Sequence, residues 1–145
     1  MRTTIFLALL AFSIIYALRK GGQPERAAAI VFVLMTISDP FVHALTPIQY
    51  TKLDPGHFVI DVAGWTALLA IALHARRFWP LWVSSFQTVS LVAHVVKFLD
   101  YTIHPVAYGI MQVAGSYPLL ILLMIGTANH QRRLAVNGSD PHWRN

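Results

Sequence analysis

Residues 87–104 read QTVSLVAHVVKFLDYTIH and carry the pattern that decides how this chain folds. On an α-helix, Gln87, Ser90, His94 and Lys97 fall at i, i+3, i+7 and i+10, so they share one face. Almost all the remaining positions of the helix are apolar. Polar groups in apolar surroundings are costly unless partners satisfy them. We therefore predict a helix whose polar face meets polar groups on neighbouring helices.

The composition around this helix is typical of a membrane protein. The 145 residues are 56% apolar and 12% charged, with a mean hydropathy of +0.56. An average soluble domain is about 25% charged. Runs without Asp, Glu, Lys or Arg cover residues 3–18, 78–96 and 101–131. Because stretches near 20 apolar residues are long enough to cross a bilayer, the chain is predicted to be a polytopic membrane protein.

We predict an all-α transmembrane bundle with five spans. The expected spans are residues 3–18, 27–45, 57–75, 81–99 and 107–128. Residues 1–128 would form the transmembrane domain and residues 129–145 a polar cytoplasmic tail. Pro118 is expected to kink the fifth span.

Lysine and arginine set the predicted orientation. They cluster between the first two spans, between the third and fourth, and after the fifth. An odd number of spans places these clusters on one side, which the positive-inside rule makes cytoplasmic. The N-terminus is then outside and the C-terminus inside, and we expect a bacterial inner membrane.

Charge and cysteine content exclude several function classes. The net charge of +5 and the pI near 10 would suit nucleic-acid binding in a soluble protein. Here the basic residues lie in short clusters beside apolar runs, as topology signals do, so nucleic acid is not an expected partner. Without cysteine, thiolate metal sites, disulfide exchange and covalent haem attachment are excluded. No serine lies in a nucleophile-elbow context, so the sequence does not indicate a hydrolase.

The predicted topology brings polar residues of four spans into one outer layer. Intramembrane ionisable residues normally face the bundle interior and pair with one another. We predict an outer-side pocket that binds a metal ion, a proton or a small polar ligand. Its candidate residues are Asp39, His43, His57, Asp61, Gln87, His94, Lys97, Asp100, His104 and Gln112.

The same layer admits other chemistry. A divalent metal would suit imidazole and carboxylate ligands. The candidate metal ligands are His43, His57, Asp61 and His94. Haem held between His43 and His94, or a quinone head group, is an alternative cofactor. A chain of Asp, His and Lys would also suit proton handling, although the inner halves of the spans lack matching polar residues.

A non-catalytic role explains the layer equally well. The carboxylates and Lys97 would then form a structural ion-pair network in an accessory subunit of a larger membrane complex. A homodimer is a further possible assembly, since a bundle this small leaves much apolar surface for lipid or a partner.

Two predicted spans end alike, as His-Ala-Arg-Arg and His-Gln-Arg-Arg. Topology and helix capping explain these endings. They also suggest a site for anionic lipid head groups. Its residues would be Arg76, Arg77, Arg132 and Arg133.

Overall fold

The computed structural model describes residues 2–45, 55–99, 102, 104, 106–107, 110–111 and 115–144, without the side chains of residues 2, 3 and 43. This part of the chain is all-α and has no strand. Its five named helices are α1 (Arg2–Lys20), α2 (Gln23–Leu45), α3 (Pro55–His74), α4 (Trp79–Leu99) and α6 (Ser116–Asn137).

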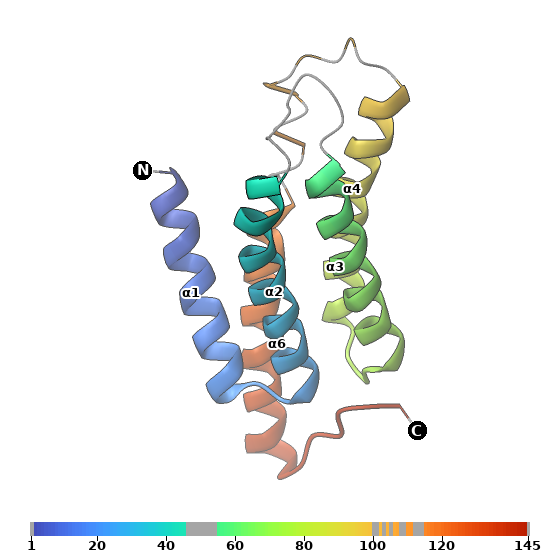
Figure 1. The fold of residues 1–145 in the computed structure, drawn as a ribbon. Helices are drawn as coiled ribbons and strands as arrows, with labels where there is room; N and C mark the ends of the chain where they lie inside the picture. Colours follow the sequence, from blue (N-terminus) through green and yellow to red (C-terminus); the bar gives the residue numbers. More distant parts are fainter. Residues whose placement is uncertain are drawn as a thin grey trace.

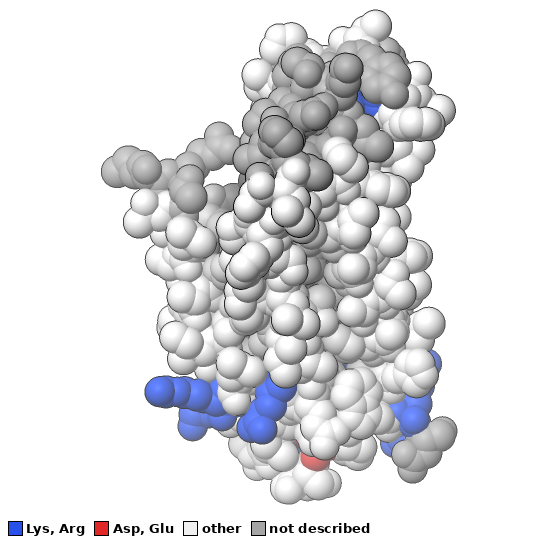
Figure 2. All heavy atoms as spheres, viewed as in Figure 1, with Lys and Arg blue, Asp and Glu red and all other residues white. Residues whose placement is uncertain are grey.

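The helices form an up-and-down bundle (Figure 1). Packing runs in a ring from α1 to α2, α3, α4 and α6 and back to α1, and α2 also touches α6 across the bundle. Successive named helices alternate in direction, so α1, α3 and α6 all end where α2 and α4 begin, and the neighbours α1 and α6 run parallel (Figure 1). We call this the basic end, because most of the lysine and arginine side chains in view gather there (Figure 2).

Small residues allow close packing inside the ring. Ala17, Ala28 and Ala29 are fully buried where α1 meets α2. On α6, a Cβ atom at Gly126 would lie 2.7 Å from the Trp79 ring, so only glycine leaves room for that indole. Such close contacts suit helices that associate by van der Waals packing.

The first four helices lie close to their predicted bounds, but α6 corrects the fifth. Of the predicted span 107–128, the described residues 107, 110 and 111 are helical, and the named helix α6 begins at Ser116 and continues to Asn137. Pro118 therefore lies in the first turn, where proline fits a helix, and not at a mid-helix kink. The helix ends at Gly138, whose φ of 70° turns the chain back toward the bundle and whose N–H bonds the Leu134 carbonyl at 2.9 Å.

Among the described residues, α3 is the single helix that is long and apolar enough by itself to qualify as a membrane span. The helical bundle is thus observed, and the five-span membrane arrangement is a proposal taken up below.

Candidate functional site

A single carboxyl group contacts three of the four polar side chains on the predicted face of α4. Asp61, in the second turn of α3, accepts a hydrogen bond from Gln87 Nε2 on Oδ1 at 3.0 Å. Its Oδ2 accepts the Ser90 hydroxyl at 2.6 Å and lies 3.1 Å from His94 Nε2. All three α4 side chains are buried, and His94 is fully enclosed. Gln87 and Ser90 thus donate to the two carboxyl oxygens of Asp61, and His94 completes the group of side chains around them.

A second acid and histidine join α2 to α3 beside this group. His57 Nε2 lies 3.0 Å from Asp39 Oδ1. Both side chains are partly exposed, at 32% and 46%. The pair is therefore more exposed than Asp61, whose side chain is 16% exposed.

The two groups share a cavity of about 410 Å³ to which all five helices contribute. Its polar patch consists mainly of Asp39, His57, Asp61, Gln87 and Ser90. Its apolar walls include Phe6, Leu10, Phe32, Met35, Ile60, Leu119 and Leu120. No described lysine or arginine lines it, so its fixed charge is acidic. The volume lies within the roughly 300–1,000 Å³ typical of small-molecule sites.

The described geometry favours hydrogen bonding over metal ligation. Within residues 2–45, 55–99 and the later described positions, no three His, Asp or Glu side chains are grouped so as to hold a metal ion. Of the predicted metal ligands, His94 contacts Asp61, and His57 contacts Asp39. The His43 side chain lies outside the described set.

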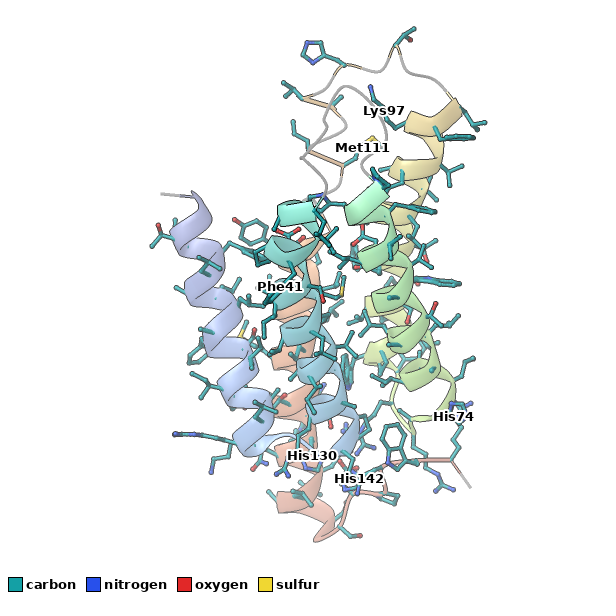
Figure 3. The ribbon with its side chains drawn as sticks, viewed as in Figure 1. Phe41, His74, Lys97, Met111, His130 and His142 are labelled. Atoms are coloured by element: carbon teal, nitrogen blue, oxygen red, sulfur yellow. The ribbon has the colours of Figure 1, made fainter. Side chains whose placement is uncertain are left out.

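The remaining predicted pocket residues do not all reach this cavity. Lys97 is fully buried and lies toward the end of α4 far from the basic end (Figure 3). His104 is exposed, and its Nδ1 accepts the Val106 N–H at 3.3 Å. Asp100 and Gln112 are outside the described residues. The structure thus brings together Asp39, His57, Asp61, Gln87 and His94.

The basic end holds a second carboxyl cluster, centred on Asp140. Its Oδ2 lies 2.6 Å from Arg77 Nη2 and 2.5 Å from His130 Nδ1, and its Oδ1 lies 2.9 Å from Arg133 Nε. Burial raises the pKa of Asp140, but the hydrogen bonds from Arg133 and His130 and the charges of Arg77 and Arg133 outweigh burial and hold the pKa below its ordinary value.

The chain after α6 is bound to the bundle. Residues 138–144, which we call the C-terminal strap, cross the basic end and pair with the α3–α4 turn. Arg76 N–H donates to the His142 carbonyl at 3.0 Å, and Arg144 N–H to the His74 carbonyl at 2.7 Å. Trp143 Nε1 donates to Gln23 Oε1. Of the predicted polar tail, residues 129–137 belong to α6, and the residues that follow are bound to the bundle.

Arg77 lies between two buried carboxyl groups. Besides Asp140, it approaches Glu25, with 3.5 Å between Nε and Oε1, and Glu25 also accepts Trp79 Nε1 at 3.0 Å. Of the four residues predicted to meet lipid head groups, Arg76 and Arg132 are exposed, whereas Arg77 and Arg133 bind Asp140.

The basic-end cluster of Glu25, Arg77, His130, Arg133 and Asp140 was not predicted from the sequence. Glu25, His130 and Asp140 were assigned to a loop and a tail, where charged residues are usually solvated. One signal was present: Trp143 is a large aromatic residue in an otherwise polar stretch, and such a side chain gains most when it packs.

Comparison with protein-family models, curated proteins and solved structures finds no match for this chain.

Proposed function

We propose that this chain is a small integral membrane protein whose cavity binds a small molecule with an apolar body and a cationic or hydrogen-bond-donating head. The observation that carries the proposal is the cavity itself, in which acidic groups from α2 and α3 line one side of an otherwise apolar space.

Exposed apolar side chains support the membrane setting. Every named helix presents large apolar residues outward; Phe12, Phe41 and Phe98 are 62%, 68% and 57% exposed. In Figure 2, the face in view shows a broad belt without Lys, Arg, Asp or Glu above the basic end. A soluble monomer rarely exposes a continuous apolar surface of this extent. A lipid bilayer is the environment in which such an apolar surface is stable.

The charge distribution supports an orientation. The basic end collects the termini of α1, α3 and α6 with their arginines and lysines (Figures 1 and 2). By the positive-inside rule this end faces the cytoplasm, as in a bacterial inner membrane, and the cavity lies toward the outer side.

The cavity lining supports the choice of ligand. Asp39 and Asp61 supply acceptor oxygens to the cavity wall, and no described lysine or arginine lines this wall. A protonated amine or a hydroxyl group would complement this patch, while an alkyl or ring portion would pack against Phe6, Phe32 and Leu119. A metal ion fits less well, because the described acids and histidines are already paired with one another.

Binding of a matched pair of probes tests the proposal. Octylamine and octanoic acid differ in head group but share an apolar chain. We expect saturable binding of octylamine to the detergent-purified protein in isothermal titration calorimetry, and weaker binding of octanoic acid. Asp61→Asn should lower octylamine affinity about tenfold or more, because a hydrogen bond to a charged group contributes about 1.5–3 kcal/mol. Equal binding of both probes by both proteins would refute an acidic ligand site.

An accessory subunit remains the second candidate, and one observation favours it. Asp61 already has three donors, so its network is complete without a ligand. In that case, gentle-detergent purification would yield stoichiometric co-elution with a larger membrane complex. Elemental analysis and an absorption spectrum of the same sample would show neither metal nor haem, and octylamine would not bind.

A further inference from the structure

The three side chains that contact Asp140 form an anion-binding site. Two of its three donors are almost enclosed: the Arg77 side chain is 3% exposed and the His130 side chain 6%. The third, Arg133, is 35% exposed and closes the site from the surface side. Charge-assisted hydrogen bonds of this kind are stronger than neutral ones and favour binding of carboxylate and phosphate.

Without Asp140, the charged side chains of the cluster carry a net positive charge that one negative group balances. Arg77 and Arg133 carry two positive charges, and Glu25 provides one buried negative charge beside Arg77. Asp140 supplies the second negative charge and makes the four groups neutral. If Asp140 moved out of the site, Arg77, His130 and Arg133 would require another monoanion, because an unpaired buried charge is strongly destabilising.

A phosphodiester has the shape that this site accepts. Arg77 and His130 share one oxygen of Asp140, and Arg133 binds the other. The two unesterified oxygens of a phosphodiester carry a single negative charge and can take the places of these two carboxylate oxygens.

The surroundings would attract such a group. Arg19, Lys20, Arg26, Arg76 and Arg132 are exposed at the same end of the bundle. Basic residues beside an apolar belt are attracted to anionic lipid surfaces by about 1 kcal/mol each. The Asp140 site lies within this basic surface.

We propose that Arg77, His130 and Arg133 form a phosphate-binding site that the strap residue Asp140 occupies as an internal substitute, and that a phosphate group replaces Asp140 when the strap lifts. The site is independent of the cavity proposed above. Its phosphate comes from an anionic lipid head group or from free phosphate, and the experiment below separates the two.

Lifting the strap has defined local consequences. It breaks the bonds from Arg76 N–H to the His142 carbonyl and from Arg144 N–H to the His74 carbonyl. It also breaks the contact of Trp143 with Gln23. Amide exchange at residues 76 and 144 and the fluorescence of Trp143 therefore report the position of the strap.

The test uses the full chain in dodecylmaltoside micelles. Asp140→Asn empties the site of its carboxylate, and Ser139→Ala is a control at an exposed neighbouring strap position. Each protein is titrated with inorganic phosphate and, separately, with short-chain phosphatidylglycerol, and its melting temperature is measured. We expect the melting temperature of Asp140→Asn to rise by about 3–6 °C at roughly ten times Kd, with little change in the wild type and in Ser139→Ala.

The probes and a double variant complete the test. Stabilisation by both compounds would assign a general phosphate site, and stabilisation by phosphatidylglycerol alone would assign a lipid head-group site. Adding Arg77→Gln to Asp140→Asn should abolish the response. If Asp140→Asn responds no more than the wild type does, the proposal is overturned.

A measurement on the wild type covers the case in which the variants do not fold. We expect a large excess of phosphatidylglycerol or phosphate to speed amide exchange at residues 76 and 144, because phosphate would displace Asp140 and free the strap. Unchanged exchange at both residues under saturating amounts of both compounds would also overturn the proposal.

Discussion

Asp61 and Asp140 each receive three side-chain donors, yet the donors differ in kind. Asp61 meets an amide, a hydroxyl and an imidazole, all from α4. Asp140 meets two guanidinium groups and an imidazole, from the α3–α4 turn and α6. The first carboxyl group joins two neighbouring helices, and the second fastens the end of the chain across the bundle.

This difference indicates different roles: the Asp61 group lines a surface that can bind a ligand, and the Asp140 cluster holds the end of the chain against the bundle. Asp61 is held by an amide, a hydroxyl and an imidazole beside a cavity that no described lysine or arginine lines, so we expect this cavity to attract a cation. Arginines cancel the charge of Asp140, and the compensated group stabilises the fold. The two regions should therefore respond differently to mutation and to acid.

The largest effect is expected for Arg77→Gln. This change leaves Glu25 and Asp140 buried without their shared cation, and breaking a buried ion pair costs about 3–5 kcal/mol. Unfolding in detergent, followed by circular dichroism, measures the loss. Arg76→Gln is the matched control: that side chain is exposed, so its effect should stay within about 0.5 kcal/mol. Equal effects at both positions would remove the distinction between the buried and the exposed arginine.

We expect low pH to reduce the stability of the folded protein through Asp140, by an amount between the effects of Arg77→Gln and Ser90→Ala. The pKa of Asp140 is held below its ordinary value of 3.8 in the folded protein. Its contribution to stability is thus fully present above about pH 3.8 and is lost as the pH falls further through the lower folded pKa. Wild-type protein should lose more stability between pH 5 and pH 2 than Asp140→Asn does, in thermal unfolding at each pH. Parallel pH profiles would contradict this assignment.

The smallest effect is expected at Ser90. Ser90→Ala removes one of three donors to Asp61 and should cost about 0.6–1 kcal/mol, as single polar contacts between membrane helices do. Ser85→Ala is its control, because that hydroxyl donates within its own helix, to the Leu81 carbonyl at 2.8 Å. Unfolding in SDS titrations compares the two. A loss at Ser90 as large as that at Arg77 would mean that both carboxyl groups fasten the fold equally.

The sequence by itself determined the helices and the polar face of α4. Apolar runs and the i, i+3, i+7 spacing of Gln87, Ser90 and His94 are local properties, and α4 carries that face where it was predicted. The sequence also indicated that Asp39, His57 and Asp61 would lie near this face, because successive helices of a bundle pack antiparallel.

Only the tertiary structure decided which of these groups meet and what the end of the chain does. Spacing along one helix does not specify the partner on the next, so the choice of Asp61 for the α4 stripe depends on helix rotation and packing. The strap is the clearer case. Glu25, Arg77 and Asp140 are far apart in the sequence and look solvated there, and they become a buried cluster only because Gly138 turns the chain back across the bundle.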